Sequence, residues 1–211
     1  MIADALSGFA ARSTASIRAA RDLAGRFWRA ENGVALIEFA FTLPVMVILY
    51  LGSIVVTQGM MTDRKVTLLT RALGDIVAQD TTVTATERDE IFNAARVVMT
   101  PYDVGPEVID MRVSSVRVKT DATTCVEWSI APTGSVFARA PGEVLDALIP
   151  VAIRTPNTWL IMAEVQYRYT PIVGDDLTGP IILNERLYMR PRAVTQVSSF
   201  NQPATPPCPD T

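Results

Sequence analysis

A run of twenty-four uncharged residues, from Phe39 to Thr62, constrains this chain of 211 residues more than any other feature. A helix of that length rises about 36 Å at about 1.5 Å per residue, whereas the hydrocarbon core of a bilayer is about 30 Å thick. Buried helices of soluble proteins seldom contain so long an uncharged stretch. No small-x-small cleavage site or cysteine follows the run, as a secretory or a lipoprotein signal would require. The sequence therefore predicts a membrane-spanning helix over residues 34–62.

Basic residues predict how this helix is oriented. Five of them precede the run, namely Arg12, Arg18, Arg21, Arg26 and Arg29. Three follow it closely, namely Arg64, Lys65 and Arg71. Because cytoplasmic flanks carry the excess of Lys and Arg, we expect the N-terminus in the cytoplasm and the chain after about residue 63 outside it. Residues 1–33 then form a basic cytoplasmic leader.

Composition limits the functions open to the chain. The sequence has no histidine and a formal net charge of -3. The first fact removes Ser-His-Asp and Cys-His catalysis and nearly all zinc-enzyme sites, and the second does not match a basic nucleic-acid-binding domain. Four acidic residues show no spacing that marks a catalytic pair: Glu143, Asp146, Glu164 and Glu185. We therefore expect no catalytic residue, metal, cofactor or nucleic-acid partner, and the sequence identifies no small-molecule substrate.

Glu38 stands at the start of the predicted span, five residues after Gly33. A carboxylate in hydrocarbon costs several kcal/mol unless it is paired. Two interpretations follow from the residues alone. In the first, Glu38 lies at the headgroup level, where the cost is small and the positive end of the helix dipole stabilises it. In the second, its charge has a functional partner in the membrane.

The spacing of Gly33 and Glu38, after a basic leader and before an apolar run, resembles the processing site of type IV prepilins. In that family an inner-membrane prepilin peptidase cuts after the glycine, and the new amine lies close to the glutamate at the fifth mature position. The resemblance implies cleavage between Gly33 and Val34, with Glu38 as the partner of the new ammonium group. Each charge is costly in lipid alone, and together they offset each other.

The wider string from Glu31 to Gly52 resembles the TadE-like minor pseudopilins of tight-adherence (Flp) pilus systems. The matching positions are Arg26, Arg29, Gly33, Ile37, Glu38, Phe39, Leu43 and Pro44. A Glu-Phe pair in place of the Glu-Tyr of the major Flp pilin, and a much longer chain, favour a minor component of the pilus. Pro44 removes a helical hydrogen bond, which makes it either a simple kink in the anchor or a soft point that lets the helix enter a fibre.

The resemblance implies a non-enzymatic, single-pass protein of the bacterial inner membrane with a periplasmic domain. It also implies the partners: the prepilin peptidase, other pilin-type subunits and the pilus assembly platform with its secretion ATPase. The main alternative is a periplasmic binding or envelope-scaffold module on an uncleaved signal anchor, which would keep residues 1–33 and tolerate Glu38→Gln. A membrane-tethered hydrolase is disfavoured, because nothing resembles a nucleophile elbow or a metal motif.

Apolar residues at steps of three and four predict that the helix continues as an amphipathic stalk to about Gln79. A second helix is expected to begin at Thr86, as cap with Asp89 three residues on, and to end before Pro101. These two helices occupy residues 63–100.

Over residues 101–192 the period changes to two and predicts an antiparallel sheet covered on one side, hence an α+β fold like that of pilins. A first strand contains Ile109 to Val118 with a bulge after Ser114-Ser115, and a second has Val126, Trp128 and Ile130 on one face. Further strands cover 159–170 and 181–189, and residues 143–148 are expected to form a short helix.

Cys125 falls in a predicted strand and Cys208 in the Pro-rich tail of residues 193–211. In an oxidising periplasm the two would form a disulfide that pins the tail to the sheet. The alternative is a pair of free thiols.

Overall fold

The computed structural model describes residues 32–171, 179–205, 207 and 208. Residues 1–31 of the basic leader lie outside the described residues. The chain divides into two units, residues 1–53 and 54–211. Helix α2, Asn32–Gln79, belongs in part to each, and it is assigned as one helix through Pro44 and Gly74. The prediction of one helix from the span to Gln79 is confirmed.

In the second unit, α2 packs through a buried stripe of Val66, Leu69, Leu73 and Val77. Gly74 lies on the same side. A Cβ at this position would come within 3.4 Å of the Ala163 Cβ and of the Met189 Sδ. The missing side chain therefore lets the helix approach the sheet closely.

Helix α3, Ala85–Val97, begins one residue after its N-cap, Thr84. The Thr84 hydroxyl accepts a hydrogen bond from the Glu87 backbone N–H, and the Glu87 carboxylate accepts one from the Thr84 N–H, which completes a capping box. The predicted cap at Thr86 with Asp89 is therefore wrong. In Thr84-x-x-Glu87 the third helical position is a glutamate, the residue that a capping box prefers. The predicted box would have had an aspartate, Asp89, at that position.

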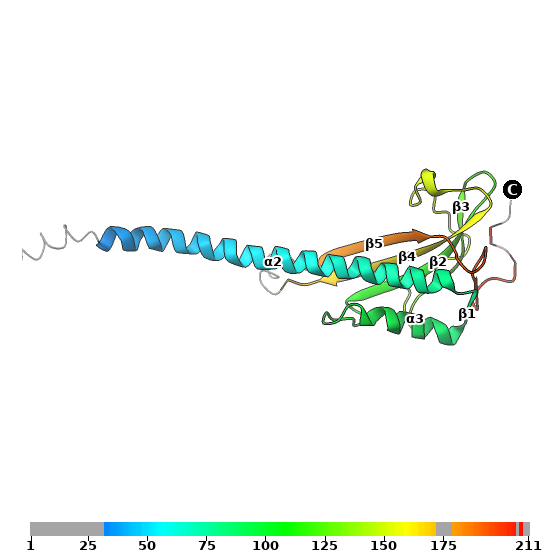
Figure 1. The fold of residues 1–211 in the computed structure, drawn as a ribbon, viewed down its shortest axis with the longest axis horizontal. Coiled ribbons are helices and arrows are strands. Elements are labelled where there is room, and N and C mark those ends of the chain that lie inside the picture. Colours follow the sequence, from blue (N-terminus) through cyan, green and yellow to red (C-terminus); the bar gives the residue numbers. More distant parts are fainter. Residues whose placement is uncertain (1–31, 172–178, 206, 209–211) are drawn as a thin grey trace, which may run out of the picture. The chain divides into compact units, whose positions relative to one another are not determined.

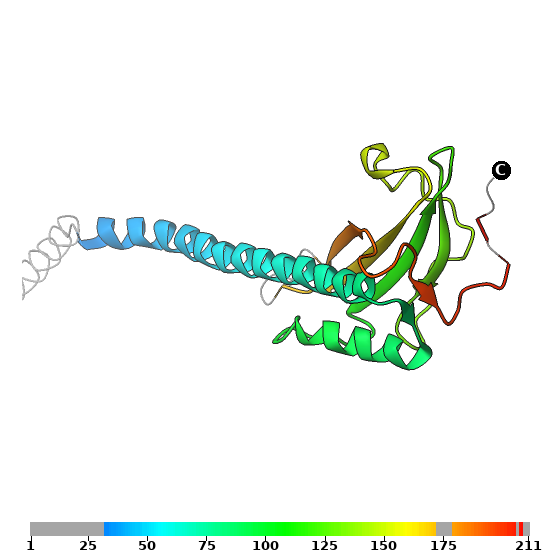
Figure 2. The same cartoon turned by 45° about the vertical axis from the view of Figure 1, so that its right-hand side comes forward.

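A four-stranded antiparallel sheet forms the centre of the second unit, with the order β3-β2-β4-β5. Its strands are β2 (Ile109–Val118), β3 (Thr124–Ile130), β4 (Thr158–Tyr169) and β5 (Ile181–Met189). Two short strands, β1 (Thr82–Val83) and β6 (Ser198–Ser199), pair in parallel beside it. Helices α2 and α3 lie side by side on one face of the sheet (Figures 1 and 2). The α+β fold, with a long N-terminal helix on a small antiparallel sheet, is confirmed.

The sheet has a core on both faces, which corrects the prediction of a sheet covered on one side. The larger core joins α2 and α3 to odd-numbered residues of β2 and β4, such as Met111 and Ile161. The smaller core lies on the opposite face, around Val116, Met162 and Leu145. Figure 2 shows the loop that carries Leu145, in yellow-green, on the side of the sheet away from the helices.

The pairing of β2 with β3 shifts between Ser115 and Val116, at the level where a bulge was predicted. The extra residue, however, is Glu127 of β3, because Ser115 pairs with Trp128 and Val116 with Val126. Val126 consequently faces the smaller core while Trp128 faces the larger one. The prediction that they share a face is therefore wrong.

Residues 143–148 do not form the predicted helix. The Val126 N–H donates to the Glu143 carbonyl and the Leu145 N–H to the Thr124 carbonyl, so this segment runs along the free edge of β3. Pairing with the edge satisfies backbone groups that a helix would have satisfied internally. The helical turn η1 is formed later, by Val151–Ile153.

Candidate functional site

The sequence-predicted site lies on residues 33–53 of α2, in the first unit. Apolar side chains point outward all around this part of the helix; Phe39 is 63% exposed and Phe41 77%. Within the described part of the chain, α2 is the one helix long and apolar enough to cross a membrane. Nothing in the described part of the chain covers these side chains, and an apolar surface of this size is typical of a membrane or protein contact.

The proposed processing site, Gly33-Val34, is in the first turn of α2. Val34 is 69% exposed, and no atom lies within 4 Å of the position that a Gly33 Cβ would occupy. Both residues of the Gly33–Val34 bond are therefore exposed in the described part of the chain.

Glu38 is exposed one turn after Val34. Residues four apart lie on the same helix face, and helical side chains lean toward the N-terminus. We therefore expect the Glu38 carboxylate on the same helix face as the backbone nitrogen of Val34. An amine released at Val34 would meet this carboxylate within the same chain.

Leu43 and Pro44 follow on the same helix. The chain stays helical at Pro44 although its nitrogen has no hydrogen to donate. The Thr42 hydroxyl donates to the Glu38 carbonyl over 2.8 Å, in the helical turn before the proline. Hydroxyl back-bonding of this kind often accompanies a bent helix.

The structure joins Cys125 and Cys208 in a disulfide, across 83 positions of sequence. A hydrogen bond also holds Cys208 at the sheet, because Nη1 of Arg117 in β2 donates to the Cys208 carbonyl over 3.1 Å. Both sulfur-bearing side chains are almost completely buried. Cys208 of the tail is thereby held against β3, as predicted.

An arginine–glutamate cluster in the second unit was not predicted from the sequence. Arg112 of β2, Glu164 of β4 and Arg186 of β5 occupy one cross-strand row. Both arginines donate to the Glu164 carboxylate through Nε, Arg112 over 2.6 Å and Arg186 over 2.9 Å. Arg139, from the loop after β3, also bonds this carboxylate and reaches on to Glu143. The cluster fastens that loop to three strands.

Burial of Glu164, which is only 4% exposed, disfavours its charge and by itself raises the pKa. Hydrogen bonds from Arg139 and Arg112, and the charges of both arginines, outweigh this effect and lower the pKa from 4.5 to about 2. The carboxylate is therefore ionised at neutral pH. Strand alternation places all three row positions on one sheet face, but only the register shows that they meet.

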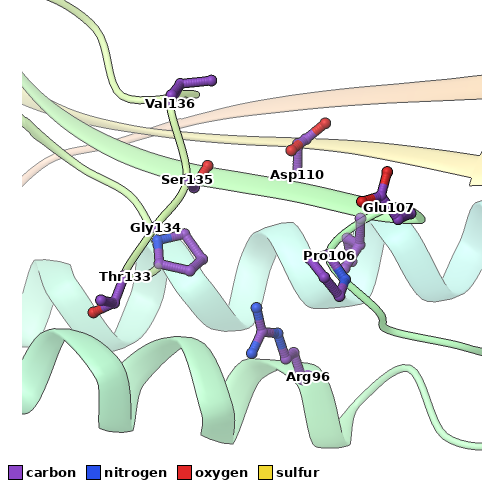
Figure 3. Close-up of a pocket in the computed structure, with 10 residues that line it drawn as sticks. Arg96, Pro106, Glu107, Asp110, Thr133, Gly134, Ser135 and Val136 are labelled. Atoms are coloured by element: carbon purple, nitrogen blue, oxygen red, sulfur yellow. The ribbon is translucent and has the colours of Figure 1, made fainter.

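A cavity of about 460 Å³ lies between α3, the segment before β2 and the loop after β3 (Figure 3). Figure 3 shows the Arg96 guanidinium pointing from α3 toward this loop. Glu107 and Asp110 supply negative charge, and Asp110 already accepts from Arg168 over 2.9 Å. Among the residues with described positions, no three acidic or cysteine side chains meet as a metal site would require.

Comparisons with protein-family models, with curated proteins and with solved structures give no significant match to this chain.

Proposed function

We propose that this chain is a TadE-like minor pseudopilin, a single-pass protein of the bacterial inner membrane that takes part in assembling a Flp pilus and has no catalytic role. One observation carries the proposal. A carboxylate, Glu38, lies one helical turn after an exposed Gly33–Val34 bond, on a helix whose apolar side chains are uncovered.

Cleavage at this bond would create a charge partner for Glu38. The released amine of Val34 is protonated at neutral pH, since the ordinary pKa of an α-amino group is about 8. We expect Glu38 on the same helix face. The pair lowers the cost of holding either charge at the edge of hydrocarbon, within one subunit or between neighbouring ones.

The uncovered apolar surface of residues 34–53 suits a protein that exchanges lipid for other helices. In a bilayer these side chains are solvated by acyl chains, and in an assembly they would pack on the corresponding helices of other pilin-type subunits. Neither state requires a change in the helix itself. The surface therefore supports both membrane storage and assembly.

The basic leader supports an orientation with residues 1–33 in the cytoplasm and the second unit in the periplasm. The Cys125–Cys208 disulfide agrees with this orientation, because disulfides persist in the periplasm and are rare in the cytosol. The partners are then the prepilin peptidase at Gly33, other pilin-type subunits along the helix, and the assembly platform with its ATPase.

The test is to replace the chromosomal copy by Glu38→Gln, which keeps the shape of the side chain and removes its charge. We expect the variant to reach the membrane with its disulfide formed, but surface pili and attachment to be lost. Glu90→Gln, an exposed carboxylate on α3, is the matched control and should behave as wild type. Normal pili with Glu38→Gln would contradict the proposal and favour a signal-anchored envelope scaffold.

A further inference from the structure

A groove of about 550 Å³ opens beside the last turns of the uncharged run, entirely within the second unit. Its apolar and aromatic lining comes from α2, from the segment between α3 and β2, and from β4, namely Met61, Tyr102, Val108, Tyr167 and Tyr169. Gln58, Asp103 and Arg168 are among its polar lining residues. The groove thus combines apolar and aromatic side chains with a few polar ones.

Tyr169 is the lining residue whose polar group most needs a hydrogen-bond partner. It is 7% exposed, and its ring lies 3.8 Å from the position that a Gly59 Cβ would occupy. Its hydroxyl is buried and has no hydrogen-bond partner among the residues the structure describes. A buried hydroxyl left without a partner costs about 1–3 kcal/mol, so a ligand oxygen in the groove would be stabilising.

The position of the groove along the chain identifies its surroundings. Gln58 and Met61 belong to the uncharged run that ends at Thr62, and Met61 is 56% exposed. Twenty residues counted from Phe39 end at Gln58, and at about 1.5 Å per residue they span the roughly 30 Å of a hydrocarbon core. Side chains that pack against Gly59 therefore lie at the level of the lipid headgroups.

The chemistry of the lining fits that level. Tyrosine is enriched where membrane meets water, because its ring is apolar and its hydroxyl polar. Arg168 lies on the rim, with its side chain 38% exposed and hydrogen-bonded to the Glu107 carbonyl and to Asp110. Asp103 is the acidic residue of the lining, and Lys65, which donates to the Val98 carbonyl, is a further nearby cation.

We propose that this edge of the second unit is immersed in the headgroup layer and that the groove holds a phospholipid. An acyl chain lies along Met61 and the tyrosine rings, and an ester or phosphate oxygen accepts a hydrogen bond from the Tyr169 hydroxyl. The inference rests on the proposed membrane span and extends it to a lipid site on the folded domain.

Spin labels on the full chain, reconstituted in vesicles of phosphatidylethanolamine and phosphatidylglycerol, test the immersion. Single labels are attached to Met61→Cys and Asp103→Cys, with Leu49→Cys as a hydrocarbon reference and Val136→Cys, a fully exposed loop position, as an aqueous reference. The native cysteines are bridged and do not compete. We expect the ratio of collisions with oxygen to those with a water-soluble nickel complex to fall between the two references at both groove positions.

The outcomes distinguish the lipid site from the membrane span on which it rests. If the Asp103→Cys label matches the aqueous reference while Leu49→Cys reports hydrocarbon, the lipid site is refuted and the span stands. If Leu49→Cys is itself in water, the span is refuted as well. Dipolar broadening at Asp103→Cys that grows with the ratio of protein to lipid would mean that a second copy fills the groove, which also overturns the proposal.

Tyr169→Phe tests the hydrogen bond. After extraction in mild detergent, native mass spectrometry counts the phospholipid retained on the full chain. We expect retention to fall about fivefold, the effect of one hydrogen bond of about 1 kcal/mol. Tyr50→Phe, on the exposed helix surface, should retain as much as wild type. Equal retention by Tyr169→Phe and wild type would refute the site.

Discussion

Arg139 holds both carboxylate oxygens of Glu164, with its Nε 2.9 Å from Oε2 and its Nη2 3.0 Å from Oε1. This two-point contact joins the loop after β3 to the middle of the sheet. Arg112 and Arg186 bond the same carboxylate from the neighbouring strands. Glu164 is therefore the one negative charge that three guanidinium groups share directly.

Removing that charge should destabilise the second unit. Glu164→Gln leaves three arginines at a nearly buried site without their common counter-charge, and breaking a buried ion pair in this way costs about 3–5 kcal/mol. Thermal unfolding of the full chain in detergent, followed by near-UV circular dichroism, measures the effect. Glu90→Gln should stay within about 0.5 kcal/mol of wild type. Equal stability of the two variants would mean that the cluster contributes no net stability.

The same carboxylate predicts a dependence of stability on acid. Its pKa is about 2 in the folded state and about 4.5 when the chain is unfolded, so between these values the unfolded state binds more protons. Its contribution is present above about pH 4.5 and is lost as the pH falls toward 2. The difference in urea midpoint between wild type and Glu164→Gln should therefore shrink over that window. A difference that stays constant down to pH 2 would contradict the lowered pKa.

The disulfide predicts that Cys125 and Cys208 stabilise the domain as one unit. Cys125→Ala and Cys208→Ala should each lower the free energy of unfolding by about 2–5 kcal/mol, since the closed loop is long. The double variant should lose no more than either single one. Alkylation of wild type extracted without reductant should label no cysteine. Labelling of both thiols would show that the bridge does not form.

The capping box predicts a difference between two neighbouring threonines. Thr84→Ala removes the acceptor for the Glu87 N–H and should cost about 1 kcal/mol. Thr86→Ala, inside the first turn of α3, should change stability by less than about 0.5 kcal/mol. Urea unfolding of both variants in detergent measures the two changes in stability. A larger loss of stability for Thr86→Ala than for Thr84→Ala would mean that Thr86 is the cap, as the sequence pattern alone predicts.

Local patterns in the sequence predict most of the elements. The steps of three and four that end at Gln79, and the alternation along residues 158–169, reflect side chains that face one core in a regular element. The prediction for the side chain of Val126 was wrong, because a single extra residue, Glu127, reverses the alternation of faces within β3. The prediction of a helix over 143–148 was wrong, because backbone groups of that segment form hydrogen bonds with the edge of β3.

The arginine–glutamate cluster depends on information that no local pattern contains. Arg112 and Glu164 are 52 residues apart, and they meet only because β2 and β4 pair in one particular register. The disulfide, by contrast, could be predicted, because the chain contains only two cysteines. The residues of the proposed processing site are close in sequence, so their spacing alone places Glu38 one helical turn after Val34.

The central claim is that Glu38 pairs with an amine released at Val34, and the intact mass of the membrane-extracted protein tests it most directly. The account predicts that the wild-type chain begins at Val34 with a free amine, whereas Gly33→Ala keeps residues 1–33. Gly52→Ala, a second exposed glycine of α2 with open space around it, is the control and should be processed like wild type. A wild-type chain that still begins at Met1, as Gly33→Ala is expected to do, would contradict the account.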